Sequence, residues 1–204
     1  HTRLQGDWSS DVCSSDLSGN AWLLNGEPFD HIIFTAPLPQ TCQLLGLALP
    51  ENPFIPCLAL LLRYQGDPAG RTADRYAIAD PASPTLAWSA CENHKLGRIP
   101  SGSTALVAHA SEAFSRAHLE SPPELWANLL RTEVETLWHL DPTALTAQLP
   151  HRWRYARVAG IIASPDLPPG IHHASDALIA SRVESAYLSG TQTATRLLNS
   201  LGPM

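Results

Sequence analysis

The stretch Ile171–Leu201, IHHASDALIASRVESAYLSGTQTATRLLNSL, decides the fold that the rest of the chain must match. It begins with a short and mostly apolar segment, Ile171–Ala174, which follows prolines and a glycine and predicts a strand. A polar turn with Asp176 comes next, and a long helix follows. Apolar or small residues recur in that helix at the spacing of one face, which we expect to be buried: Val183, Ala186, Tyr187, Gly190, Ala194, Leu197, Leu198 and Leu201.

The turn between this strand and this helix is a candidate binding site. A strand that turns sharply into a helix leaves unpaired backbone N–H groups and the positive end of the helix dipole at the turn. These groups suit an anionic or electron-rich ligand. An ordinary strand–turn–helix unit without a ligand explains the same residues, since a lone acid in a turn is common. The residues alone leave both interpretations open.

The same stretch resembles the segment that closes the FAD-binding domain in the flavin amine oxidase superfamily, most of all in its renalase-like branch. The matching residues are Ala174–Ala177 and then Arg182–Gly190, RVESAYLSG. The resemblance implies that Asp176 hydrogen-bonds FAD near its ribityl and pyrophosphate groups, and that the helix N-terminus points at the pyrimidine edge of the flavin. The cofactor-binding candidates here are Ser175, Asp176, Ala177, Arg182, Val183 and Glu184. The superfamily's usual glycine is Ser175 in this chain, which would be strained if the backbone needed a positive φ.

A second strand with a continuous apolar centre is predicted over Phe29–Thr35, and prolines stop it. The superfamily carries a similar apolar run followed by Thr-Ala-Pro where the chain passes from the FAD domain to the substrate domain. By this resemblance Thr35, Ala36 and Pro37 lie near the cofactor. A buried strand with a proline stop is the simpler explanation for any one of them.

The region from Glu51 to Pro150 has a different pattern. Short strands joined by turn-rich links predict an antiparallel sheet, and two helices follow, Ser111–Leu119 and Pro123–Leu140. In the second helix we place these residues on one side: Leu125, Leu129, Leu130, Val134, Leu137 and Trp138. Three ordered segments resemble the substrate domain of the renalase-like branch and its return: PCLA from Pro56, WSACENHKLGR from Trp88 and WRYA from Trp153.

Together these features predict an α/β chain with an α+β second region. By resemblance it is the C-terminal part of a two-domain, FAD-binding Rossmann-type fold whose substrate domain is an antiparallel sheet with helices. We expect residues 18–40 and 151–204 to form a partial FAD-binding domain and residues 41–150 to form the substrate domain.

The start of the chain is unusual. Residues 7–17, DWSSDVCSSDL, resemble the translation of a sequencing-library adapter. We therefore expect residues 1–17 to be a non-native or disordered segment, genuine sequence to begin near Ser18 and the true N-terminal portion to be missing. The chain contains no G-x-G, the core of the NAD(P)- and FAD-binding fingerprint. A truncated start predicts that absence, and with it poor FAD binding by this chain alone.

The implied chemistry is a two-electron oxidation of a small-molecule substrate by FAD, with oxygen reoxidising the flavin. The substrate class is an amine or a reduced nicotinamide-type compound. Arg182 and Trp153 are the candidate catalytic residues: Arg182 beside a flavin carbonyl, and Trp153 stacked on the flavin or substrate plane. Trp153 packing a domain junction explains that residue equally well. The competing hypothesis for the whole chain is a non-catalytic α+β binding module without a cofactor.

Composition restricts the partners. The chain has 204 residues, of which 44% are hydrophobic and 16% charged, and its formal net charge is −6. That charge gives no reason to expect nucleic acid or an anionic membrane as a partner, and no apolar run reaches membrane-spanning length. The four cysteines form no C-x-x-C pair and the histidines have no metal-site spacing, so no metal is expected. Isolated cysteines favour free thiols and a cytoplasmic location.

Overall fold

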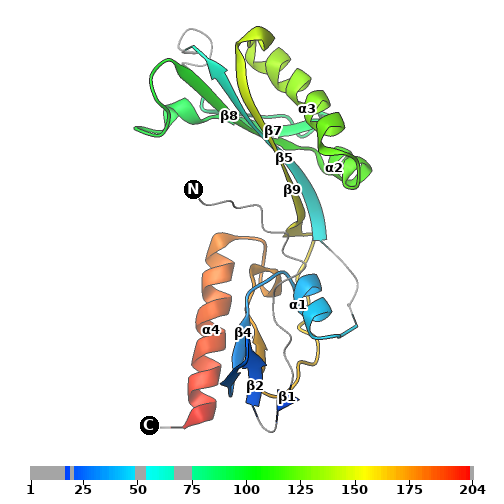
Figure 1. The fold of residues 1–204 in the computed structure, drawn as a ribbon, viewed down its shortest axis with the longest axis vertical. Coiled ribbons are helices and arrows are strands. Elements are labelled where there is room, and N and C mark those ends of the chain that lie inside the picture. The colour runs from blue at the N-terminus through cyan, green and yellow to red at the C-terminus, as the bar shows by residue number, and fades with distance from the viewer. Residues whose placement is uncertain (1–16, 19–20, 49–53, 67–74, 203–204) are drawn as a thin grey trace. The chain divides into compact units, whose positions relative to one another are not determined.

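The computed structural model describes residues 17–18, 21–48, 54–66 and 75–202. The chain divides into two compact units. Unit 1 consists of the segments up to Pro53 and from Arg157 onward, and unit 2 is Phe54–Ala156. Helices and strands both contribute to the fold (Figure 1), so the predicted α/β class is confirmed.

Unit 1 begins with a small antiparallel sheet. Strand β1 (Leu17–Ser18) pairs with β2 (Ala21–Leu24), which forms a hairpin with β3 (Glu27–Phe29). The turn residues Asn25 and Gly26 have φ values of 54° and 82°. Positive φ at both positions is what a tight two-residue hairpin turn requires, which explains the Asn-Gly pair.

A parallel two-stranded sheet forms the centre of unit 1. Strand β4 (Ile32–Phe34) pairs with β10 (Ile171–His173), with Ile32 opposite Ile171 and Phe34 opposite His173. Buried Trp22, Phe34 and Ile171 form a small apolar cluster beside this sheet. Both predicted strands are therefore present. The strand predicted over 29–35 is shorter, since Phe29 ends the hairpin instead.

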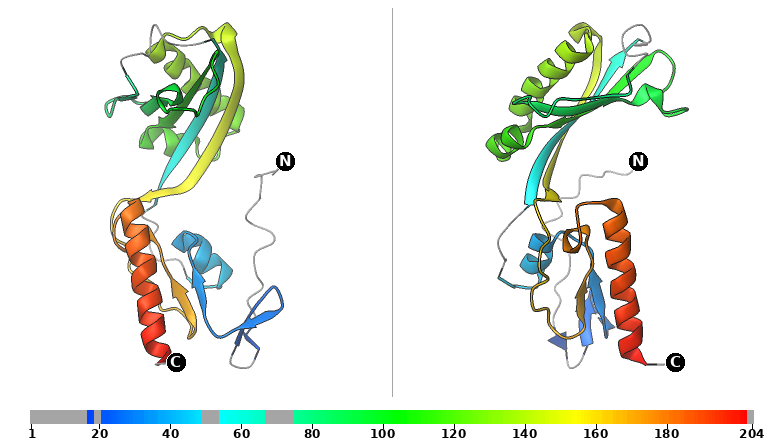
Figure 2. Two further views of the ribbon diagram at one scale, coloured as in Figure 1. Left: turned by 90° about the vertical axis from the view of Figure 1, so that its left-hand side faces the viewer. Right: turned by 180° about the vertical axis from the view of Figure 1, so that it is seen from behind.

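Two α-helices belong to unit 1. Helix α1 (Leu38–Leu44) starts directly after Pro37, and helix α4 (Val183–Leu201) follows the 3₁₀ turn Asp176–Leu178. Helix α4 lies along β10 and β4 in each view (Figures 1 and 2). The predicted strand, polar turn and long helix of this stretch are thus confirmed.

The predicted buried face of α4 is wrong. The buried residues are Ser185, Ser189 and Thr193. Val183 is 91% exposed and Tyr187 is 72% exposed. Ser189 faces the interior, where its hydroxyl accepts a hydrogen bond from the Ser175 N–H at 3.0 Å. The apolar stripe points outward from unit 1 instead.

Unit 2 is a five-stranded sheet in the order β6-β7-β8-β5-β9. Its strands are β5 (Phe54–Gln65), β6 (Ala77–Ala79), β7 (Leu86–Cys91), β8 (Ser103–Ala110) and β9 (Leu145–Val158). The pairs β6/β7, β7/β8 and β5/β8 are antiparallel, as the sequence predicts. Helices α2 (Glu112–His118) and α3 (Pro123–Trp138) cover one face of the sheet (Figure 2).

The core of unit 2 lies between α3 and the sheet. Helix α3 buries Trp126, Ala127, Leu130, Val134, Glu135 and Trp138. Leu125 and Leu129 are exposed, so the side predicted for this helix is only partly correct. The buried Glu135 carboxylate accepts a hydrogen bond from the Tyr64 hydroxyl at 3.0 Å. Burial and that carboxylate raise the pKa of Tyr64 far above its ordinary value, so the hydroxyl keeps its proton.

The boundary between the units differs from the predicted one. Residues 41–48 lie in unit 1 because α1 packs there: the Thr41 hydroxyl donates to the Ala36 carbonyl, and Leu44 packs against the Trp22 cluster. Residues 151–156 lie in unit 2 because β9 is one unbroken strand beside β5. The expected non-native segment, residues 1–17, lies outside the described residues except for Leu17, which pairs with Trp22.

Among the described helices, none combines the length and the apolar character that crossing a membrane requires.

Candidate functional site

The parallel pairing of β4 and β10 brings the two predicted ligand-binding segments to the same edge of the sheet. Thr35–Pro37 follows the carboxyl end of β4, and Ser175–Ala177 follows the carboxyl end of β10. The Ala174 N–H donates to the Phe34 carbonyl at 3.0 Å, which extends the pairing beyond the last ladder residues. Ligands of open α/β sheets bind at this edge.

His173 fixes the two segments to each other. Its Nε2 donates to the Ala36 carbonyl at 2.9 Å across the two strand ends. The side chain is only 5% exposed, and burial lowers the pKa of His173, although the Ala36 carbonyl acts in the opposite direction. The ring is therefore neutral near pH 7 and carries its proton on Nε2, since a carbonyl can only accept.

Ser175 caps the turn that holds Asp176. Its backbone is extended, with φ −158°, so the serine is not strained where the superfamily has glycine. The Ser175 hydroxyl accepts from the Ala177 N–H at 3.2 Å and lies 3.2 Å from the Asp176 carboxylate, to which it donates. Ala177 is buried, and its carbonyl accepts from the Ile162 N–H. The turn thus presents a partly buried carboxylate on a rigid backbone.

Arg182, Val183 and Glu184 begin α4 just after this turn, and all three are exposed. Arg182 is the N-cap residue in extended conformation, and its side chain makes no capping hydrogen bond. Glu184 places a negative charge in the first turn, which stabilises the positive end of the helix dipole. The start of α4 therefore lacks the side-chain cap that most helices use to satisfy their first N–H groups.

Trp153 belongs to unit 2 and not to the group in unit 1. It lies on β9, where its ring is 54% exposed and meets the His151 ring edge-on at a centroid distance of 4.3 Å. The structure therefore collects Thr35–Pro37, Ser175–Ala177 and Arg182–Glu184 in one unit, while Trp153 presents an open aromatic face in the other.

Sequence reasoning missed two residues that build this site. No local sequence pattern assigns His173 or Ser189 a role at a binding site. A sequence feature that indicates a role for His173 is its position at the end of a buried strand, three residues before Asp176. The Ser189 signal was the recurrence of small polar residues every four positions, which marks a close helix contact.

Acidification is expected to destabilise unit 1. An unfolded histidine titrates near pH 6.5, and burial holds the pKa of folded His173 below that value. Below about pH 6.5 the unfolded chain binds the extra proton, so the free energy of unfolding falls as the pH falls. Burial of His172 acts in the same direction. Denaturant unfolding at pH 7.5 and 5.5 checks this, and His173→Gln should flatten the pH dependence. Equal stability at both pH values would contradict it.

Within the ranges that the structure describes, no group of three or more His, Cys, Asp or Glu side chains is placed to hold a metal ion.

No model of a known protein family matches the chain. Solved structures do resemble it. An Exiguobacterium protein assigned as a protoporphyrinogen oxidase matches 88% of this chain with a TM-score of 0.65 and 13% identity. Putrescine oxidase matches 88% with a TM-score of 0.59 and 15% identity. Cyclohexylamine oxidase of Brevibacterium oxydans matches 93% with a TM-score of 0.57 and 13% identity.

The chain spans less than half of each of these proteins: 44%, 45% and 47% of their lengths. At such identities the likeness is one of fold. The fold is thus that of roughly half of an amine oxidase-type structure.

Proposed function

We propose that this chain is the second half of an FAD-dependent oxidoreductase of the flavin amine oxidase superfamily. The observation that carries the proposal is the parallel β4–β10 pair, which places Thr35–Pro37 and Ser175–Ala177 at one sheet edge. The likeness of the fold to oxidases over most of the chain supports it. The first half, with the G-x-G-x-x-G strand–helix unit, would come from a preceding segment.

The residues at this edge fit part of FAD. The Asp176 carboxylate is an acceptor for ribityl hydroxyls, and the start of α4 has no side-chain cap to compete with the electron-rich pyrimidine edge. Thr35, Ala36 and Pro37 line the neighbouring strand end, and Val183 and Glu184 supply the first helical N–H groups. When bound, FAD would supply a two-electron acceptor for a hydride from the substrate.

Arg182 and Trp153 take the catalytic roles in this proposal. The exposed Arg182 guanidinium would stabilise negative charge that develops on the reduced flavin. The half-exposed Trp153 ring would orient a planar substrate or the flavin by stacking, since hydride transfer depends on alignment. The substrate is a small amine or reduced nicotinamide-type compound, and oxygen is the final acceptor. Cys42 and Cys91 are buried free thiols in the part of the chain that the structure describes, which supports a cytoplasmic setting.

The test of the proposal is flavin content. We would express the source gene with its upstream sequence beside the present chain, and measure protein-bound flavin by absorbance. The longer protein should retain stoichiometric FAD, and the present chain should not. A longer protein that binds no flavin would favour the non-catalytic α+β module. Stoichiometric flavin on the present chain would refute the need for a first half.

Arg182→Ala in the longer protein should slow flavin reduction about tenfold or more, because a preorganised donor to developing charge is lost. Stopped-flow absorbance of the flavin under anaerobic conditions measures this rate. Arg116→Ala is the matched control, since it removes an exposed arginine of α2 that pairs with Glu112 at the surface. An unchanged reduction rate in Arg182→Ala would remove Arg182 from the mechanism.

A further inference from the structure

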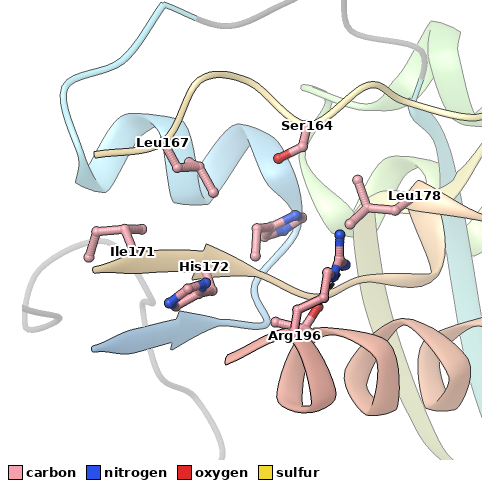
Figure 3. A pocket seen from close by; sticks show the side chains of 8 residues that line it. Ser164, Leu167, Ile171, His172, Leu178 and Arg196 are labelled. Atoms are coloured by element: carbon pink, nitrogen blue, oxygen red, sulfur yellow. Dashed lines mark hydrogen bonds between the residues drawn. The ribbon is translucent and has the colours of Figure 1, made fainter. Parts of the chain in front are cut away.

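A pocket of about 230 Å³ lies in unit 1 among β10, α4 and the loop that precedes β10 (Figure 3). Leu167 and Leu178 give it apolar walls, and Ser164, His173 and Arg196 bring polar groups. Arg196 rises from α4 past β10 toward Leu178 in Figure 3. The pocket therefore combines a cation with hydrogen-bonding groups and a small apolar wall.

His173, which lines this pocket, has an unused acceptor. Its Nε2 already donates to the Ala36 carbonyl, and its Nδ1 is buried with no hydrogen-bond partner among the described residues. Because burial keeps the ring neutral, Nδ1 carries a lone pair and can only accept. A buried acceptor without a donor is costly, and a ligand hydroxyl would satisfy it.

Arg196 brings a positive charge without a carboxylate partner in the part of the chain that the structure describes. Two long hydrogen bonds, to the Gln192 carbonyl at 3.3 Å and the Thr193 hydroxyl at 3.5 Å, use only part of its five N–H donors. The pKa of His172, which also lines the pocket, is lowered first by burial and then by the charges of His31 and Arg196. The positive charge of Arg196 therefore acts on the pocket wall, and no carboxylate among the described residues neutralises it.

We propose that this pocket binds a small oxyanion that carries its own hydroxyl, an α-hydroxy carboxylate or hydrogen phosphate. Arg196 binds the anionic oxygens, and His173 Nδ1 accepts the hydrogen bond of the ligand hydroxyl. Leu167 and Leu178 leave room for a short apolar group on a carboxylate. Both features are needed: the cation selects the charge, and the acceptor selects the hydroxyl.

The pocket shares His173 and Leu178 with the sheet edge that is proposed to face FAD, but its cation lies far along α4 from the start of that helix. Arg196 follows Val183 by about three and a half helical turns, which corresponds to about 20 Å of helix rise. The binding proposed here therefore does not depend on the flavin proposal, and it can be measured on the present chain alone.

The test is a titration of the full chain, labelled with ¹⁵N-histidine, with sodium L-lactate, sodium acetate and inorganic phosphate. Lactate and phosphate should bind saturably and move the His173 Nδ1 resonance. Acetate, which has no hydroxyl, should bind about tenfold more weakly than lactate. The comparison of lactate with acetate uses the unaltered chain, so it does not depend on any variant folding.

Arg196→Gln should weaken lactate and phosphate binding about tenfold or more, because charge-assisted hydrogen bonds are lost. Arg116→Gln removes an equal charge from α2 and should leave binding unchanged. No saturable shift with lactate or phosphate would overturn the proposal. So would equal binding by the Arg196→Gln and Arg116→Gln variants, or equal binding of lactate and acetate. Saturable binding of phosphate without any binding of lactate would identify hydrogen phosphate, and not an α-hydroxy carboxylate, as the ligand of this pocket.

Discussion

Leu130→Ala is expected to lower the free energy of unfolding of unit 2 by about 2–5 kcal/mol. Leu130 is fully buried on α3, in the cluster that joins this helix to β5 and β8. Truncation removes its transfer free energy and leaves a cavity, because the surrounding Trp126 and Val134 cannot collapse fully. A loss of this size is a large part of the whole stability of a small domain.

Leu129→Ala is the matched control. It removes the same atoms from the preceding residue of α3, where the side chain is 51% exposed, and should cost about 0.5 kcal/mol or less. Amide hydrogen exchange in the β5–β8 ladder under native conditions measures both variants, because it reports the stability of unit 2 by itself. Equal losses for the two variants would show that α3 packs with a different face.

Gly170→Ala is expected to destabilise unit 1 by about 2–5 kcal/mol, from left-handed strain and overpacking together. Gly170 has φ +82°, and an added Cβ would lie 2.6 Å from the Asp30 carbonyl oxygen and 2.9 Å from Trp22 Nε1. The backbone oxygen cannot move away freely, because the Gly170 carbonyl also accepts from the Ile32 N–H at 2.9 Å beside it. The substitution therefore separates the start of β10 from β4.

Gly102→Ala separates the two contributions. Gly102 has a similar φ of +73°, but a Cβ there would meet no atom within 4 Å. It should cost its own unit only about 1–2 kcal/mol of backbone strain. Exchange of the Ile32 amide reports the Gly170 variant, and exchange in the β5–β8 ladder reports the Gly102 variant. A Gly170→Ala cost no larger than that of Gly102→Ala would mean that the close approach to Asp30 is absent.

Local sequence patterns predict where the helices and strands lie, but they do not predict which side of each helix is buried. Prolines and apolar runs located β4 and β10, and the antiparallel strands of unit 2 came from turn spacing. The predicted side of α3 is only partly correct, and that of α4 is wrong because counting apolar residues ignores which backbone groups need partners. On α4, Ser189 faces inward to satisfy the Ser175 N–H, and the leucines turn away.

The candidate site depended on information that no local pattern contains. The parallel register that sets Phe34 opposite His173 joins segments far apart in the chain. The resemblance to a superfamily implies that both segments lie near one ligand, whereas periodicity implies nothing of the kind. The pocket beside Arg196 cannot be predicted from the sequence. Its residues come from a strand, a loop and a helix, and no sequence spacing encodes how these segments pack.

The outward apolar stripe of α4 has an evolutionary consequence. A chain under selection to work alone would gain solubility from lysine or glutamate at its most exposed apolar positions, Val183, Tyr187, Leu198 and Leu201. A chain that packs permanently against a further segment of the same protein would keep these positions apolar. If the proposed function is correct, polar substitutions at these four helix positions in related genes will be found where the gene encodes no segment that packs against α4.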